Sequence, residues 1–182
     1  RRAAIDRVIS HIPGAARFGA VIIIGLIRGI VRPNITQTQA EQWLREAIQE
    51  CCLAAKKEEV RLALEPINRY ETTLINNSTQ GLELIKKVKA DNFGLLLDTF
   101  HMNMEEPQIE ASIQRCGDRI FHFHVADSNR WYPGAGHLNF SSILAALVST
   151  GYDGWVSGEF LPMPDVESAA LENIQNIKKY LG

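Results

Sequence analysis

The chain has 182 residues, about the length of one domain or slightly more. Hydrophobic residues make up 46% of it and charged residues 22%, which favours a folded globular chain over general disorder. Nineteen Lys and Arg residues against 21 Asp and Glu residues give a net charge of -2, without the basic excess typical of nucleic-acid-binding domains. A nucleic-acid partner is therefore not expected.

The apolar segments and cysteines indicate the environment of the chain. The longest apolar segment, 20–27, stops at Arg28, well short of the ~20 residues that a membrane-spanning helix needs. Cys51 and Cys52 are adjacent and only Cys116 is distant, unlike the evenly spaced cysteines of a secreted disulfide framework. We expect no membrane span and a reducing, cytoplasmic location.

Five short apolar segments predict strands. Most are continuous rather than alternating, as is typical of parallel strands that are covered on both faces. In chain order they are 20–27, 60–64, 93–97, 120–125 and 155–157.

Amphipathic patterns between the strands predict helices, several with a recognisable N-terminal residue. Five helices are expected. The first runs from the capping box Thr38–Glu41 to about Glu58, the second begins at Ser78 or Thr79, and the third begins at Pro107. The fourth spans about 141–150, and the fifth runs from Asp165 to Leu181. Strand and helix thus alternate, which predicts an α/β fold. An open doubly wound sheet and part of an eight-stranded barrel both fit this alternation.

Four of the five predicted strands end in a residue that can bind a metal ion. They are Glu65, Asp98, His124 and Glu159, at successive spacings of 33, 26 and 35 residues, each about one βα unit. In a barrel, the carboxyl ends of neighbouring strands meet at one mouth, so these side chains could surround one point. Three carboxylates and one imidazole favour Mn²⁺, Mg²⁺ or Co²⁺.

Further polar side chains follow the same strand ends. Glu71 comes six residues after Glu65, and His101 and Arg130 lie in the segments after the next two strands. We expect these three side chains on loops at the same mouth, where residues of α/β proteins contact substrates.

Four segments together resemble a known family. They are Glu65-Pro-Ile-Asn-Arg-Tyr-Glu71, Asp98-Thr-Phe-His101-Met-Asn-Met-Glu-Glu106, His122-Phe-His124 with Asn129-Arg130, and Pro133-Gly-Ala-Gly136. With these segments, the sequence is similar to the sugar phosphate isomerase/epimerase family of xylose isomerase-like TIM barrels, and most to ketose 3-epimerases of the D-tagatose/D-psicose type. The resemblance covers nearly all of residues 1–182. It implies a single partial (β/α)8 TIM-barrel domain over 1–182, the C-terminal portion with about five βα units, strands 4–8.

The resemblance also implies roles for individual residues. The expected metal ligands, for Mn²⁺ or Co²⁺ in that family, are Glu65, Asp98, His124 and Glu159. Glu65 and Glu159 would also form the acid/base pair. The residues expected to hold a sugar substrate are Glu71, His101 and Arg130. Asp127-Ser128 departs from the residues expected in a sugar 3-epimerase, and a related branch acts on oxidised sugars or glycosides, so the substrate stays open.

These residues can support epimerisation. A metal bound to the carbonyl and neighbouring hydroxyl of a ketose polarises the carbonyl and stabilises a cis-enediolate. Two glutamates on opposite faces can then remove the proton and return it to the other face, which inverts the carbon.

Two other functions fit the same residues. An aldose–ketose or hydroxypyruvate-type isomerase would return the proton to the adjacent carbon. A catalytically inactive fragment would act only as a sugar- or metal-binding or assembly module. This alternative arises because the sequence predicts five strands, whereas a closed barrel has eight and typically about 250 residues. Five strands would leave open sheet edges that another chain or segment covers. We therefore expect self-association, or a piece of a longer protein.

Overall fold

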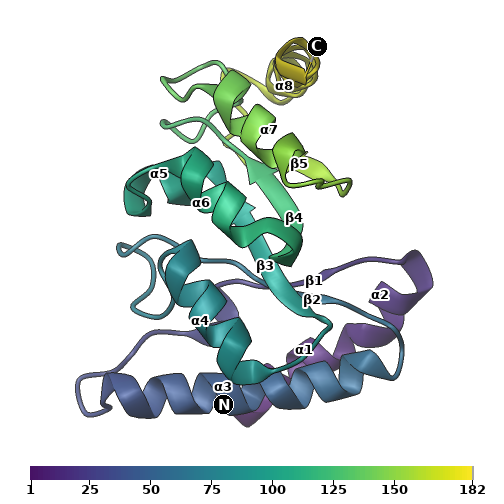
Figure 1. The fold of residues 1–182 in the computed structure, drawn as a ribbon, viewed down its shortest axis with the longest axis vertical. Coiled ribbons are helices and arrows are strands. Elements are labelled where there is room, and N and C mark those ends of the chain that lie inside the picture. Colours follow the sequence, from purple (N-terminus) through teal and green to yellow (C-terminus); the bar gives the residue numbers. More distant parts are fainter. Residues whose placement is uncertain (182) are drawn as a thin grey trace. The chain divides into compact units, whose positions relative to one another are not determined.

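The computed structural model describes residues 1–181, and its chain forms two compact units, Arg1–Leu96 and the part from Leu97 onward. Strands and helices alternate within each unit (Figure 1). The expectation of a single domain over 1–182 remains a prediction. Among the described residues, every helix is too short or too polar to span a membrane.

The five expected strands are present, and all observed pairings are parallel. Their hydrogen-bonded order follows the chain, β1-β2-β3-β4-β5, as successive βα units require. The strands are β1 (Ile22–Ile24), β2 (Leu62–Leu64), β3 (Phe93–Asp98), β4 (Ile120–Val125) and β5 (Val156–Gly158). β2 and β3 are buried along their whole length, as expected of strands covered on both faces. The same expectation is wrong for β1 and β5, because Ile23 and Gly158 are exposed.

The first strand is shorter than its apolar segment. The sequence predicts a strand over 20–27, but β1 ends at Ile24, and the backbone of Gly25 leaves the extended conformation. A 3₁₀ turn, η1 (Leu26–Arg28), takes up the remaining residues. An apolar segment alone does not show where its backbone turns.

The first unit contains four α-helices that pack in the order α2, α1, α3 and α4. α3 contacts both α1 and α4, and Figure 1 shows it along the edge of this unit. The helices are α1 (Arg2–Ser10), α2 (Ile12–Phe18), α3 (Gln37–Lys56) and α4 (Ser78–Val88).

Two helix starts differ from the expected ones by one or two residues. Thr36, rather than Thr38, caps α3, because its hydroxyl accepts a hydrogen bond from the backbone N–H of Gln39. Asn77, rather than Ser78 or Thr79, caps α4 through the N–H of Gln80. In both cases the residue with an extended backbone supplies the cap, as this geometry requires.

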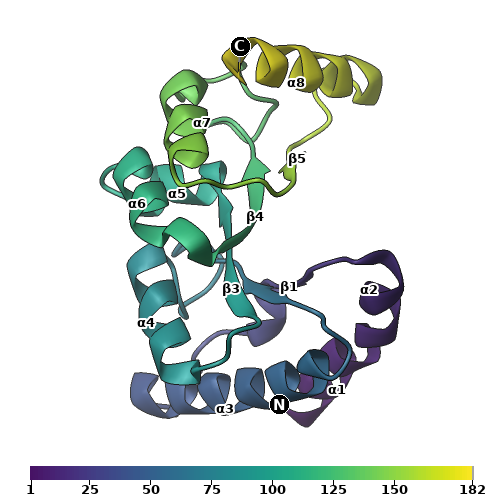
Figure 2. The same ribbon diagram turned by 45° about the vertical axis from the view of Figure 1, so that its right-hand side comes forward.

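In the second unit, α7 packs between α6 and α8 (Figure 2). The rings of Phe140 and Tyr180 stack between α7 and α8, with centroids 6.0 Å apart. The helices are α5 (Thr99–Glu105), α6 (Ile109–Cys116), the 3₁₀ turn η2 (Gly117–Arg119), α7 (Phe140–Ser149) and α8 (Val166–Leu181).

α6 and α8 test the expected helix starts. α6 begins two residues after Pro107, the residue predicted to start it. The side chain of Asp165 accepts the N–H of Ser168, which confirms the predicted start of α8. α5 was not expected from the sequence pattern.

Candidate metal centre

Three of the predicted metal-ligating side chains lie together in the second unit, at the carboxyl ends of its strands. Asp98 is the last residue of β3, His124 is the fifth residue of β4, and Glu159 directly follows β5. The backbone N–H of Glu159 donates to the carbonyl of Val125, which continues the β4–β5 pairing past the end of β5.

The ligand atoms of these residues are close enough to share one ion. Nδ1 of His124 lies 3.9 Å from Oδ2 of Asp98 and 3.4 Å from Oε2 of Glu159. One ligand atom from each residue lies within 4.8 Å of the others. Asp98 is buried, whereas the side chain of Glu159 is 47% exposed. An imidazole and two carboxylates fit a divalent cation such as Mn²⁺, and the exposed side leaves space for further ligands.

The surroundings keep Glu159 ionised. A hydrogen bond with His124 lowers its pKa most strongly, burial opposes this, and Asp98 and the charge of Arg130 contribute to the lowering. The pKa of Glu159 falls to about 2. At neutral pH this carboxylate is therefore charged, the form needed for a metal ligand or a base.

Arg130 lies beside the same carboxylate. Its Nη2 is 3.6 Å from Oε2 of Glu159, and its guanidinium lies over the ring of Phe100, 4.7 Å from the centroid. The backbone of Arg130 has φ 59°, in the left-handed region that residues with a Cβ rarely adopt.

His101 lies in α5, three residues after Asp98. Its side chain is 3% exposed, and its ring meets the edge of the Phe100 ring, with centroids 5.5 Å apart. The helix therefore holds His101 in a buried position, although the sequence predicted a loop there.

The two remaining predicted residues belong to the first unit. Glu65 follows β2 and is buried, and its Oε2 lies 3.3 Å from the point where a Cβ on Gly25 would stand. Glu71 is exposed and lies between β2 and α4. Its Oε1 accepts a 2.8 Å hydrogen bond from Nδ2 of Asn68, a buried residue that the sequence analysis did not identify.

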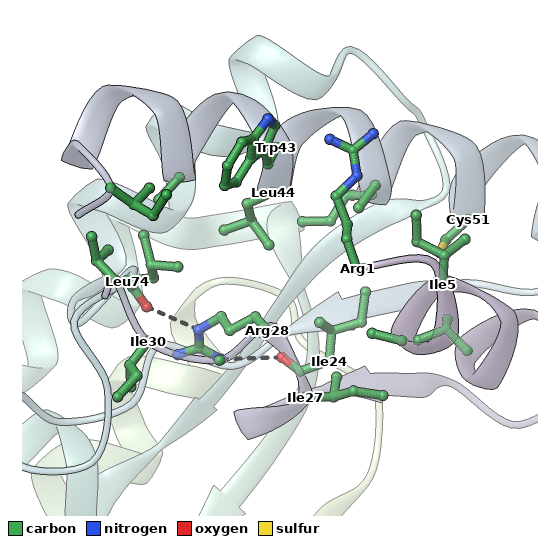
Figure 3. A pocket seen from close by; sticks show the side chains of 18 of the residues that line it. Arg1, Ile5, Ile24, Ile27, Arg28, Ile30, Trp43, Leu44, Cys51 and Leu74 are labelled. Carbon is green, nitrogen blue, oxygen red and sulfur yellow. Dashed lines mark hydrogen bonds between the residues drawn. The ribbon is translucent and has the colours of Figure 1, made fainter. Parts of the chain in front are cut away.

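The first unit also contains a separate cavity of about 420 Å³ between α1, α3 and residues 24–35 (Figure 3). Its lining is mainly apolar and includes Ile27, Ile30 and Trp43. The guanidinium of Arg28 donates to the carbonyls of Gly25 and Leu74 at 2.9 Å each. This lining contains no carboxylate or imidazole side chain.

Arg28 links this cavity to Glu65 electrostatically. Burial lowers the pKa of the Arg28 guanidinium to about 10, and the charge of Glu65 partly offsets the decrease. Arg28 therefore remains charged at neutral pH beside the residue that closes β2.

The chain is similar in sequence to several known proteins. A sequence model described as the xylose isomerase-like TIM barrel matches residues 1–180. L-ribulose 3-epimerase of Mesorhizobium japonicum is 39% identical over 114 residues, which are 62% of this chain and 38% of that protein. D-psicose 3-epimerase of Ruminiclostridium cellulolyticum is 38% identical over 111 residues, 61% of this chain and 38% of that protein.

A solved structure matches almost the whole chain. The crystal structure of D-allulose 3-epimerase from Methylomonas sp. superposes with a TM-score of 0.87 at 25% sequence identity, over 97% of this chain and 69% of that one. The aligned sequence covers about two fifths of each of the two curated relatives. The expected fold class, a (β/α)8 barrel represented here by five βα units, is confirmed.

Proposed function

The chain belongs to the xylose isomerase-like TIM-barrel family, and we propose that it carries the metal-binding part of a ketose 3-epimerase. The observation that carries the proposal is the grouping of Asp98, His124 and Glu159 at successive strand ends. The names of the related L-ribulose and D-psicose 3-epimerases favour a ketose as substrate. We treat residues 1–182 as one partial barrel domain.

We propose Glu65 as the fourth ligand. It closes β2, the strand paired with β3, just as Asp98 closes β3. A divalent cation on these four residues, Mn²⁺ by preference, would polarise the substrate carbonyl as a Lewis acid. Mg²⁺ or Co²⁺ would fit the same oxygen-rich set.

Glu65 and Glu159 are the proposed acid and base. Glu159 is ionised at neutral pH and can accept the proton next to the ketose carbonyl. A second carboxyl on the other face of the planar enediolate must return a proton there, because a single base would restore the original configuration. Glu65 takes this role.

Glu71, His101 and Arg130 are the proposed substrate-binding residues. Arg130 provides a permanent positive charge beside Glu159, where it can stabilise negative charge that develops on a substrate oxygen. His101 is fixed in α5, and Glu71 is held by Asn68. Both side chains are therefore already ordered before substrate binds.

The test replaces each proposed base singly, as Glu65→Gln and Glu159→Gln, with Glu83→Gln on the exposed face of α4 as the matched control. We expect each of the first two variants to lose epimerisation of D-psicose by at least about 100-fold. Each should still exchange the substrate proton with deuterated water for one of the two epimers only. Wild-type epimerisation in either variant would show that the two-base assignment is wrong.

Self-association and a cytoplasmic location, both expected from the sequence, stay predictions.

A further inference from the structure

The segment that carries Arg130 folds around one buried carboxylate. Asp127 is 0% exposed. Its Oδ1 accepts the backbone N–H groups of Ser128 at 2.7 Å and Leu138 at 3.1 Å, and its Oδ2 accepts that of Gly134 at 2.8 Å. One side chain therefore joins the two ends and the middle of segment 127–138.

The glycine at 136 permits this arrangement. A Cβ built on Gly136 would collide with Oδ1 of Asp127. At this position the backbone thus passes directly against the carboxylate. The segment is also attached to α8, because Nδ2 of Asn176 donates to the carbonyl of Pro133 at 2.9 Å.

The same segment fixes the unusual backbone of Arg130. The N–H of Arg130 donates to the carbonyl of Asp127 at 2.8 Å, and its carbonyl accepts the N–H of Leu161 at 2.7 Å. A non-glycine residue keeps a left-handed backbone only when its surroundings impose it. The direction of the Arg130 side chain, over Phe100 and beside Glu159, depends on that backbone conformation.

We propose that Asp127 is a positioning residue, whose buried carboxylate shapes segment 127–138 so that the Arg130 guanidinium lies over Phe100 and beside Glu159. The proposal deepens the proposed function and rests on it only for the part in which Arg130 binds substrate. A replacement of Asp127 by Asn keeps one acceptor oxygen but sets an amide NH2 against the backbone N–H groups on the other side, so the segment loses one of its two acceptors and the negative charge.

The first test needs no substrate. In nuclear magnetic resonance spectra of the protein, the side-chain protons of Arg130 should be shifted upfield, because the guanidinium lies over the face of the Phe100 ring. We expect Asp127→Asn to remove this shift and the control Asp118→Asn, the same change at an exposed carboxylate, to keep it. Gly136→Ala, which retains Asp127 but obstructs its contact with the segment, should also remove it. An unchanged shift in a folded Asp127→Asn variant overturns the proposal. If Asp127→Asn does not fold, loss of the shift in Gly136→Ala supports the proposal and an unchanged shift in that variant overturns it.

The second test asks whether Asp127 acts through Arg130. With D-psicose as substrate, we expect Asp127→Asn and Arg130→Ala each to raise KM at least tenfold. In the Arg130→Ala background, Asp127→Asn should add less than a twofold change, because the group that it positions is already absent. Full multiplication of the two effects would assign Asp127 a general structural role and overturn the proposal. A wild-type protein that does not convert D-psicose would contradict the proposed function with that sugar, while the spectroscopic test would still decide the role of Asp127.

Discussion

Oε1 of Glu71 accepts a 2.8 Å hydrogen bond from Nδ2 of Asn68, and these residues are three positions apart in the segment after β2. Asn68 is buried, and its own Oδ1 accepts the backbone N–H of Tyr70. The Asn68 amide group therefore holds the exposed Glu71 carboxylate in a fixed position relative to the backbone turn at Tyr70.

Asn68→Ala should weaken substrate binding by way of Glu71. A hydrogen bond to a charged group contributes about 1.5–3 kcal/mol, and 1.4 kcal/mol corresponds to a tenfold change in affinity. We expect KM for D-psicose to rise roughly tenfold, with a smaller change in kcat. Steady-state kinetics of this variant beside Glu71→Ala would check this, and an unchanged KM in Asn68→Ala would contradict it.

A bound cation should stabilise the fold. At ~100 times its Kd, a ligand that binds only the folded state adds about 2.7 kcal/mol to the free energy of unfolding. We expect Mn²⁺ to raise the thermal midpoint of the chelator-treated protein and to have little effect on Asp98→Asn. Asp118→Asn, with its exposed side chain, should respond as the wild type does. An equal response of Asp98→Asn and wild type would place the cation elsewhere.

The cap of α4 gives a stability prediction in the first unit. Asn77→Ala removes the acceptor of the Gln80 N–H and should cost about 1 kcal/mol in the free energy of unfolding. Thr79→Ala, at a residue first considered as the cap, should change stability much less. Urea unfolding curves of the two variants would distinguish them, and the reverse order would restore Thr79 as the capping residue.

The two adjacent thiols of α3 should be unreactive in the folded protein. Burial raises the pKa of Cys51 to about 11 and that of Cys52 to about 12, so almost no thiolate exists at pH 8. Mass spectrometry after treatment with iodoacetamide should find both unmodified, whereas the urea-unfolded chain should react at both. Rapid labelling of either thiol in the native protein would show that α3 opens.

Asp127 should contribute to acid sensitivity. Burial by itself disfavours its charged form, but the backbone N–H groups of Leu138, Ser128, Gly134 and Gly136 lower its pKa below the ordinary value. Its contribution to stability is therefore present above the unfolded pKa, near 4, and is lost as pH falls through the lower folded value. Between pH 6 and 3, unfolding midpoints should fall less in Asp127→Asn than in the wild type. Parallel curves for the two proteins would contradict this.

The sequence predicted the repeating elements well, because burial on both faces of a parallel strand leaves a continuous apolar segment. The predicted strand 120–125 coincides with β4, and 93–97 falls one residue short of β3. α5 was missed because Asp98 was interpreted only as a candidate ligand, whereas its side chain caps this helix.

The candidate site residues were chosen by residue type and by position at strand ends. This logic identified Asp98, His124 and Glu159, whose ligand atoms the structure places close together. It could not identify Asn68 or the positioning role proposed for Asp127, because both depend on which backbone N–H and side-chain groups approach them after folding. A single polar residue in an irregular segment has no periodicity to reveal its partners.

The two oxygens of Asp98 face different parts of the second unit. Oδ1 accepts the N–H of Phe100 at the start of α5, while Oδ2 faces Nδ1 of His124. An ion held by Oδ2 would restrict rotation of the carboxylate and so slow the opening of the Phe100 amide. Hydrogen exchange at this one backbone position thus becomes a local reporter of metal occupancy, and it can be read without any sugar or turnover.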